Sequence, residues 1–343
     1  MSQLQVNQIN DASGGVLAPI SSVMRNRIIN GSMRIDQRNA GAAVTLTNNQ
    51  TFIVDRWSAA EDTDGTITAQ QSTAAPAGFT NSFLFTTGTA DASLSSTQFV
   101  STRQPIEGFN VADLGWGTAN AKTVTLSFWV RSSLTGTFGG SLRNSASDRS
   151  YPFSYTILLA NTWEQKSITI AGDTTGTWLT NNGIGIALTF GLGVGSNFVG
   201  TAGAWAAGNF ISVTGATSVI GTAGATWQIT GVQLEVGTQA TSFEYRPYGT
   251  ELQLCQRYYE QLFADSGGLG VISGGYNSFT NNYAYWQFMV QKRAGASAAL
   301  IGGSWAGATP TFYTGTTKLH FYSAATFYLG ATSIPCLAAS AEL

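Results

Sequence analysis

Charge is scarce in this chain. Lys, Arg, Asp and Glu make up 10% of its 343 residues, against about 25% in a typical soluble protein. The 16 basic and 18 acidic residues nearly cancel and give a net charge of −2. Binding to a phosphate backbone requires a dense basic surface, which this sequence lacks. We therefore expect no nucleic-acid partner.

Histidine and cysteine are also nearly missing. The single histidine, His320, leaves no histidine pair for a metal ion, and no nucleophile elbow accompanies it for a serine mechanism. The two cysteines, Cys255 and Cys336, lie far apart and outside any metal-ligand spacing, so we expect buried thiols. These shortages predict a protein that is not an enzyme and holds no metal or cofactor.

Long apolar runs are the third absence. No stretch approaches 18 consecutive apolar residues, which predicts no membrane insertion, and residues 1–15 lack the basic and apolar regions of a signal peptide. The uncharged stretch from Thr174 to Leu234 is interrupted throughout by Gly, Thr, Asn and Ser. We interpret it as neutral surface and core.

The residues that are abundant favour β-structure. The chain has 40 glycines, many threonines and serines, and 12% aromatic residues, which suit pleated strands separated by turns. Apolar residues alternate strictly with other residues in the segment 123–131, as a half-buried strand requires. Similar short segments recur between Phe52 and Phe243. This pattern is typical of a β-sandwich or barrel.

Two strand patterns support finer predictions. From Gly183 to Gly195 the even positions are large and apolar, whereas the odd positions are Gly, Ala or Thr. A face with so few side chains predicts close approach of another backbone or a flat ligand. In the segment 226–236 the parity of the apolar positions switches at Gly231, which predicts a β-bulge there.

The sequence predicts four parts. Residues 1–40 contain no aromatic residue and are expected to form an extended N-terminal arm, whose four arginines make local salt bridges or partner contacts. Residues 41–248 are expected to form the sandwich. Residues 249–264 are predicted to be a linking helix with Thr250 as its N-cap, and residues 265–343 a smaller C-terminal β-domain.

Neutral polar strands with outward-facing aromatic residues suit a carbohydrate surface. An aromatic ring stacks on the C–H face of a sugar, while amides and hydroxyls bond its hydroxyl groups. Trp129 qualifies by its position on the polar face of its strand. A C-terminal patch supplies the other candidates, which are Tyr276, Asn277, Asn281, Tyr283 and Trp305. The alternative is that these aromatic residues fill a small core or a subunit interface.

Acidic residues support weaker hypotheses. Asp62 and Asp64 alternate as in part of a calcium loop, but the rest of that loop is missing, so we expect a solvated turn. The eighteen carboxylates leave glycan hydrolysis open, because a glycosidase needs only two of them.

Several stretches carry a resemblance to a known family. They are residues 25–39 (RNRIINGSMRIDQRN), residues 54–57 (VDRW), and residues 229–236 (ITGVQLEV) followed by residues 243–259 (FEYRPYGTELQLCQRYY). Together they resemble tail fibre and receptor-binding proteins of tailed bacteriophages. Residues 4–15 are similar to the virion-anchoring N-termini of such fibres.

The resemblance implies a jelly-roll β-sandwich similar to carbohydrate-binding modules, assembled as a homotrimer whose N-terminal arm docks on other tail proteins. We expect the trimer contacts to come from Leu252, Tyr258, Tyr259 and Leu262, because the helix stripe has more aromatic surface than a lone sandwich needs. The leading hypothesis is a tail fibre, exposed on the virion, that attaches it to a polysaccharide of the host surface. Two alternatives remain: an architectural tail or capsid decoration protein, and a polysaccharide depolymerase.

Overall fold

The structure is a computed structural model that describes residues 8–10, 16–19, 24–262, 276–278, 281–301, 304–307, 311–323, 327–330 and 337–343. The chain divides into two compact units, Met1–Arg246 (unit 1) and Pro247–Leu343 (unit 2). Both units consist mainly of antiparallel β-sheets. The all-β prediction is confirmed.

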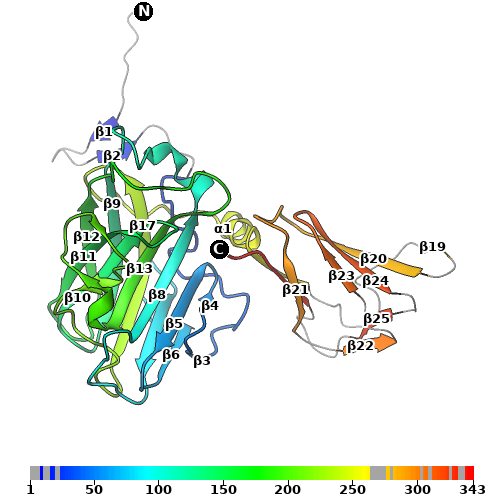
Figure 1. Cartoon of the computed structure of the whole chain (residues 1–343), viewed down its shortest axis with the longest axis horizontal. Coiled ribbons are helices and arrows are strands. Elements are labelled where there is room, and N and C mark those ends of the chain that lie inside the picture. The colour runs from blue at the N-terminus through cyan, green and yellow to red at the C-terminus, as the bar shows by residue number, and fades with distance from the viewer. Residues whose placement is uncertain are drawn as a thin grey trace, which may run out of the picture. The chain divides into compact units, whose positions relative to one another are not determined.

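Unit 1 is a sandwich of two antiparallel sheets (Figure 1). The seven-stranded sheet has the order β15 (Ala206–Ala207), β11 (Arg149–Ile157), β10 (Gly136–Arg143), β13 (Ile184–Val194), β8 (Phe99–Glu107), β5 (Trp57–Asp62) and β4 (Thr51–Val54). The six-stranded sheet has the order β12 (Glu164–Ile170), β9 (Val124–Ser132), β17 (Thr226–Val236), β7 (Ser82–Thr87), β6 (Ile67–Ser72) and β3 (Val44–Thr45). The chain crosses repeatedly between the two sheets, as in the predicted jelly roll.

Short elements complete unit 1. β1 (Gln8–Asn10) pairs with β2 (Val16–Pro19), and β14 (Val199–Gly200) forms a parallel pair with β16 (Ser212–Val213). The 3-10 helices are η1 (Gly108–Asn110), η2 (Ala112–Leu114) and η3 (Ser196–Phe198).

Alternating side chains fill the space between the two sheets. Phe128 of β9 and Phe190 of β13 meet there with ring centroids 5.2 Å apart, and Trp227 of β17 lies 5.6 Å from Phe190. All three side chains are fully buried. Each large apolar side chain buried in this way contributes about 1.5–3 kcal/mol relative to an exposed position. The period-two pattern therefore fixes which face of each strand points inward.

Three tryptophans pack against this core from loops. Ring centroids of Trp116, Trp178 and Trp205 lie 4.8–5.2 Å apart, all edge to face. Each indole N–H donates to a backbone carbonyl, at 2.7–3.1 Å. Because their polar groups are satisfied by the backbone, these rings serve packing, a role that the sequence analysis did not assign to them.

Both finer strand predictions are confirmed. Gly231 adopts φ 61°, and the pairing of β17 with β9 shifts between Thr230 and Gln233, which is the expected bulge. On the small-residue face of β13, a Cβ at Gly191 would lie 2.7 Å from the Cβ of Ser212. The close neighbour of this face is therefore strand β16 of the same chain.

Residues 24–40 belong to unit 1, which differs from the expected extended arm of residues 1–40. Ile28 and Met33 are fully buried in the core of the sandwich. Arg27 donates to a carboxylate oxygen of Asp113 at 2.7 Å, as expected of a local salt bridge. Aliphatic side chains thus supply the buried apolar area of this segment. We expected little buried area because the segment has no aromatic residue.

An asparagine ties this segment to β17. The Asn26 side chain donates to the carbonyl oxygen of Val232 at 3.0 Å and accepts from the backbone N–H groups of Ile28 and Leu234. Nearby, a Cβ at Gly31 would lie only 2.2 Å from the carbonyl oxygen of Val232. Close backbone contact is possible here only because residue 31 has no side chain.

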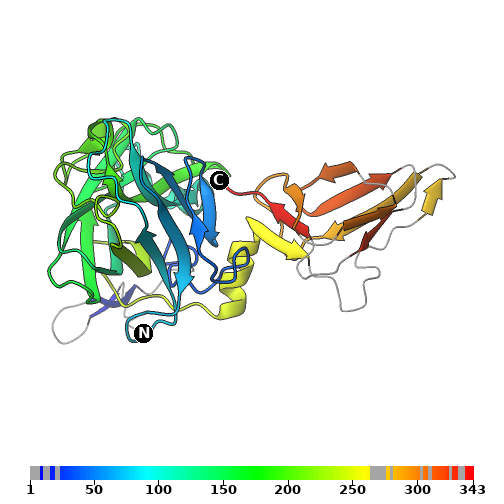
Figure 2. The same ribbon diagram turned by 90° about the horizontal axis from the view of Figure 1, so that it is seen from below.

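Unit 2 begins with α1 (Tyr248–Gln256), which leads into β18 (Tyr259–Leu262), both yellow in Figure 2. Its sheets are β18–β26 (Leu337–Ser340)–β21 (Ser297–Leu300); β19 (Tyr276–Ser278)–β20 (Asn281–Gln287)–β24 (Lys318–Ser323)–β23 (Thr311–Thr314); and β22 (Ser304–Gly307)–β25 (Phe327–Gly330). In the described part of the chain, no helix has the length and hydropathy that crossing a bilayer requires.

The helix differs from its prediction at both ends. Its N-cap is Pro247, without a side-chain cap, and Thr250 lies inside the first turn. It ends at Gln256 because residues 259–262 pair with β26 instead. The helix and the C-terminal β-domain belong to one unit, which begins at Pro247. Cys255 is a buried free thiol, as expected, and Cys336 lies outside the described residues.

A buried ion pair holds the first strand of unit 2. Lys292 Nζ lies 2.5 Å from Glu260 Oε2 and donates to the carbonyl oxygen of Gln256. The carboxylate of Glu260 also accepts from the backbone N–H of Met289. Burial lowers the pKa of Lys292, while Glu260 favours its charged form. Both charges are satisfied inside the fold, which explains how two ionic side chains remain almost fully buried.

We predict that Gly31→Ala destabilises unit 1 by about 1–3 kcal/mol, because the added methyl group must displace the backbone at Val232. Urea unfolding followed by tryptophan fluorescence measures the change. Thr73→Ala, on an exposed residue of the same unit, serves as the control and should stay within about 0.5 kcal/mol of the parent. Equal stability of the two variants would contradict the close contact.

Candidate functional site

A polar row crosses the outer face of the seven-stranded sheet. The strand registers place Ser58 opposite Arg103, Arg103 opposite Thr189, and Thr189 opposite Ser141. Their neighbours along each strand point inward, so these four side chains point away from the core. Neighbouring strands lie about 4.8 Å apart, and the row therefore spans about 14 Å. We call this row, together with Arg143, the arginine face.

Arg143 is held rigidly on this face. It is 6% exposed, donates from Nη2 to Thr189 Oγ1 at 3.2 Å, and donates from Nη1 to Asn209 Oδ1. Both acceptors are neutral. Its Nε is buried without a hydrogen-bond partner. The side chain is thus oriented by its neighbours while its charge is left uncompensated.

Arg103 lies on the same face as Arg143, two strands away on β8. It is half-buried, and its Nε is also buried without a partner. No ion pair joins either arginine to a carboxylate of the described residues. The nearest carboxylates on this face by strand register are Glu107, four residues along β8 from Arg103, and Asp62, four residues along β5 from Ser58. Four residues of a strand span about 13 Å.

The electrostatics confirm that these two cations are poorly compensated. Burial, together with the positive charge of Arg103, lowers the pKa of Arg143 to about 10. Burial alone lowers the pKa of Arg103. Both guanidinium groups remain charged at neutral pH. Two desolvated like charges therefore lie on the same face of the sheet, two strands and two residues apart by register.

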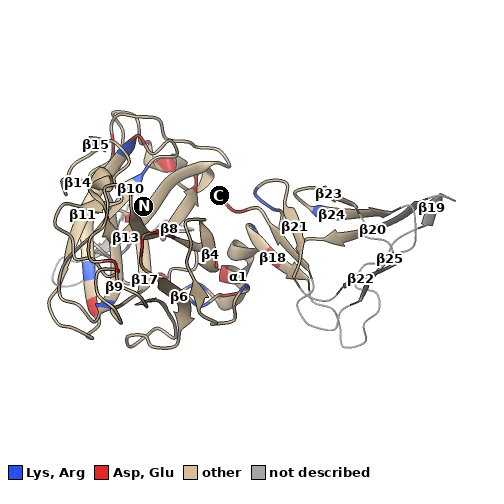
Figure 3. Cartoon of the chain, turned by 60° about the horizontal axis from the view of Figure 1, so that its bottom comes forward, with Lys and Arg blue, Asp and Glu red and all other residues tan. Residues whose placement is uncertain are grey.

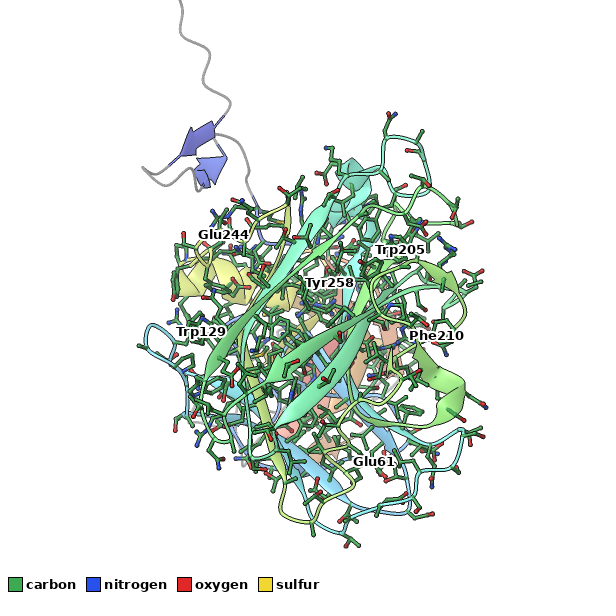
Figure 4. The ribbon with its side chains drawn as sticks, turned by 90° about the vertical axis from the view of Figure 1, so that its left-hand side faces the viewer. Glu61, Trp129, Trp205, Phe210, Glu244 and Tyr258 are labelled. Carbon is green, nitrogen blue, oxygen red and sulfur yellow. The ribbon has the colours of Figure 1, made fainter. Side chains whose placement is uncertain are left out.

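Ser141 lies on the same strand as Arg143, and Phe210 follows the Asn209 whose Oδ1 accepts from Arg143. The hydroxyl of Ser141 is fully buried without a hydrogen-bond partner. Phe210 follows Asn209 in the chain, is partly exposed, and has its backbone N–H bonded to Ser150 Oγ at 3.1 Å. Figure 4 places Phe210 and Trp205 on the side of the sandwich opposite Trp129. The arginine face thus combines charge with buried hydroxyl groups.

A small cavity lies beyond one end of β13. Its volume is about 210 Å³, and its lining carries no charged side chain. Ser212 lines it and has a buried hydroxyl without a partner. This cavity can accept a neutral polar group only.

The arginines elsewhere in unit 1 show how unusual the arginine face is. Arg149 donates to both carboxylate oxygens of Asp173, at 2.9 and 2.7 Å. Burial opposes ionisation of Asp173, but the hydrogen bonds from Arg149 and Thr175 outweigh it and lower the pKa of its carboxyl below 3.8. Charged residues are few and scattered over the described ribbon (Figure 3). A pair of arginines on one face of a sheet, neither of them paired with a carboxylate of the described residues, is therefore a distinctive feature.

Trp129, the first predicted glycan contact, lies on the outer face of the six-stranded sheet. It is half-buried and packs with Phe79 over Gly231, where both rings lie within 3.1 Å of a Cβ position. Phe79 also contacts Phe243 and Tyr245, with ring centroids 5.1 and 5.6 Å away. The structure places Trp129 in an aromatic cluster far from the arginine face, and its glycan contact remains a prediction.

The C-terminal candidates are placed only in part. Tyr276 and Asn277 lie in β19, Asn281 and Tyr283 in β20, and Trp305 in β22. The positions of their side chains lie outside what the structure describes. The register pairs Tyr276 with Asn282 and brings β19 and β20 together. Trp305 is in a different sheet.

The predicted trimer contacts are more buried than expected. Tyr258 is 0% and Tyr259 7% exposed, because the chain leaves the helix here and enters β18. Leu262 packs partly against the core of unit 2, and Leu252 is half-buried in α1. Little of either tyrosine is left for contact with another subunit. The interface itself stays a prediction.

The acidic turn lies at the end of β5. Asp62 and Asp64 are exposed, whereas the carboxylate of Glu61 accepts the backbone N–H of Thr63 at 2.7 Å. Asp91 accepts from the backbone N–H of Asp64. These contacts are those of an ordinary hydrogen-bonded turn. In the residues that the structure describes, no group of three or more His, Cys, Asp or Glu side chains is arranged to hold a metal ion.

No protein-family model matches the chain, and no curated protein matches it. Similar solved structures include the enzymatically active domain of tailspike protein 4 of bacteriophage CBA120, at 14% identity and a TM-score of 0.33, covering 63% of this chain and 22% of that one. A putative sugar binding protein from Bacteroides thetaiotaomicron has 10% identity and a TM-score of 0.36, covering 62% and 100%. The family 11 carbohydrate-binding module of Clostridium thermocellum has 10% identity and a TM-score of 0.30, covering 59% and 99%. This chain spans about a fifth of the tailspike domain's length, and at such low TM-scores these likenesses carry no functional conclusion.

We predict that Arg103→Met stabilises unit 1 by about 0.5–2 kcal/mol, because it removes a desolvated charge beside Arg143 and keeps the aliphatic stem. Arg149→Met is the matched control. It should lose about 1–3 kcal/mol, because it leaves the buried carboxylate of Asp173 without its donors. Urea unfolding measures both. Destabilisation by Arg103→Met would show that its charge is compensated in the folded chain.

A second prediction concerns acid stability. The pKa of Asp173 is lower in the folded chain than unfolded, so its stabilising contribution is full above pH 3.8 and disappears as the pH falls through the folded value. Asp173→Asn should therefore lose about 1–3 kcal/mol at pH 7. The difference from the parent should shrink steadily below about pH 4. A difference that is constant from pH 7 to pH 2.5 would rule out this ion pair as its source.

Proposed function

We propose that this chain is a non-enzymatic attachment protein of a tailed-phage virion, and that it binds a polysaccharide of the host surface through unit 1. The observation that carries the proposal is the arginine face. The Nε atoms of Arg103 and Arg143 and the hydroxyl of Ser141 lack partners within the described chain, on strands that the core holds in place. Such preorganised donors suit the many oxygen acceptors of a sugar chain.

The virion part of the proposal is supported by the sequence stretches that resemble tail fibres. Asn26, Gly31 and Arg246 come from these stretches and lie together in unit 1, where Arg246 donates to the carbonyl oxygen of Ile28 at 3.1 Å. Residues of the first and last stretches thus meet in one structural joint of the sandwich. A homotrimer, docked on other tail proteins through the residues before this joint and exposed at the particle surface, is the assembly we propose.

The test is competition for adsorption. Purified full-length chain is added to the bacterium on which virions carrying it grow, and free virions are counted over time. We expect slower adsorption, direct binding of the chain to the cells, and loss of that binding on cells stripped of surface polysaccharide. Light scattering of the same preparation should give three times the mass of one chain.

Three results would overturn the proposal. Binding to other virion proteins with no binding to cells would indicate an architectural protein. Release of reducing ends from the polysaccharide would indicate a depolymerase. Binding that survives removal of the polysaccharide would indicate a protein receptor.

A further inference from the structure

We propose that unit 1 contacts its glycan on the outer face of the six-stranded sheet, where Trp129 stacks on a sugar ring and Gln165 and Arg131 bond its hydroxyl groups. We call these three residues the tryptophan face. It is separate from the arginine face, which lies on the other sheet. The inference rests on the proposed function and deepens it, because it names the contacting residues and the groups of the sugar that they recognise.

Strand register brings the three side chains together. Gln165 of β12 lies directly opposite Trp129 of β9, and the Cβ atoms of such a pair are about 5 Å apart. Arg131 follows Trp129 by two residues and lies on the same face, about 7 Å along the strand. Phe128 and Val130, their neighbours on β9, are fully buried between the sheets. That burial directs the tryptophan face outward.

The tryptophan face is accessible in the described part of unit 1. Gln165 is exposed on the edge strand β12, and Trp129 and Arg131 are half-buried. Ser167 and Thr169, the next outward residues of β12, are exposed as well. A sugar chain that lies across β12 and β9 therefore reaches all three residues without a rearrangement of the sheet.

The polar groups of the tryptophan face are not used by the fold. Five other tryptophans of unit 1 donate their indole N–H to groups of the chain itself. The N–H of Trp129 has no acceptor among the described residues, and the amide of Gln165 and the guanidinium of Arg131 have no partner there either. These groups supply several N–H donors and one amide oxygen to a ligand.

The ring of Trp129 is held in position by its surroundings. Its Cδ1 lies 3.1 Å from the place of a Cβ at Gly231, and Phe79 packs against the same place from 2.6 Å. Gly231 adopts φ 61° at the bulge, a conformation that glycine reaches without strain. The ring is thus oriented before a ligand arrives, which lowers the entropic cost of binding.

A glycan fits these groups better than a nucleic acid does. Arg131 is the one charged residue at the outward positions of β9 and β12. Nucleic-acid bases also stack on tryptophan, but their phosphates require a line of basic residues. A sugar offers an apolar C–H face to the ring and neutral hydroxyl groups to Gln165 and Arg131. We therefore favour the glycan.

The experiment measures by calorimetry the affinity of the full chain for the polysaccharide extracted from cells that it binds. Gln165→Ala and Arg131→Met should each lower the affinity about fivefold or more, because each removes hydrogen bonds to the sugar. Trp129→Ala should lower it about tenfold or more, as expected of an aromatic anchor.

Gln239→Ala is the matched control for Gln165→Ala, because Gln239 is exposed beyond the end of β17 and outside the tryptophan face. It should bind as the parent does. Thermal unfolding of each variant shows whether it is folded. Gln165→Ala keeps the test valid if Trp129→Ala fails to fold, since the side chain of Gln165 is exposed.

The outcomes separate this inference from the function on which it rests. Parent-like affinity of Gln165→Ala and Arg131→Met would overturn the tryptophan face and leave glycan binding intact. Absence of binding by the parent chain would overturn the proposed function itself. Loss of the trimer mass by the variants, with unchanged affinity per chain, would make this face a subunit contact. Tight binding of a single-stranded oligonucleotide that depends on Arg131 would replace the glycan with a nucleic acid.

Discussion

The two-residue period of the strands is the constraint on which the rest of unit 1 depends. Once Phe128, Phe190 and Trp227 fill the space between the sheets, every neighbouring side chain must point outward, because a slip by one residue would invert both faces. The positions of Arg103 and Thr189 across from one another follow from that core. The hydrophobic interior therefore determines which polar groups the outer face presents.

The same outer face is packed in two different ways. Where β16 covers it, Gly139 and Gly191 permit close backbone packing, and a Cβ at Gly139 would lie 2.8 Å from the backbone nitrogen of Val213. Farther along the same strands, Arg103 and Arg143 leave charges uncompensated. One part of the face is thus completed by close backbone packing, and the other holds charges that lack a counter-charge within the described chain. Sites that weaken their own fold are where function is expected.

Local patterns in the sequence predicted local structure well. Alternation gave the strands, and the change of parity at Gly231 gave the bulge. The arginine face was missed because Arg103 and Arg143 are distant in sequence and become neighbours only through the registers of β8, β13 and β10. The one indication in the sequence was that Arg103 occupies an outward-facing position of its alternating strand. The helix end was missed because pairing with β26 outweighed the apolar stripe that continues through Tyr259.

The resemblance and the arginine face lie in different parts of the same unit. Asn26, Gly31 and Arg246 come from the stretches that resemble tail fibres, and they join the 24–40 segment to the rest of the sandwich through backbone contacts. Such contacts tolerate few substitutions, because each satisfies buried backbone groups. Arg103 and Arg143 lie outside those stretches, on strands whose outward positions the core does not constrain. A scaffold of this kind can keep its joint while the residues of the outer face change.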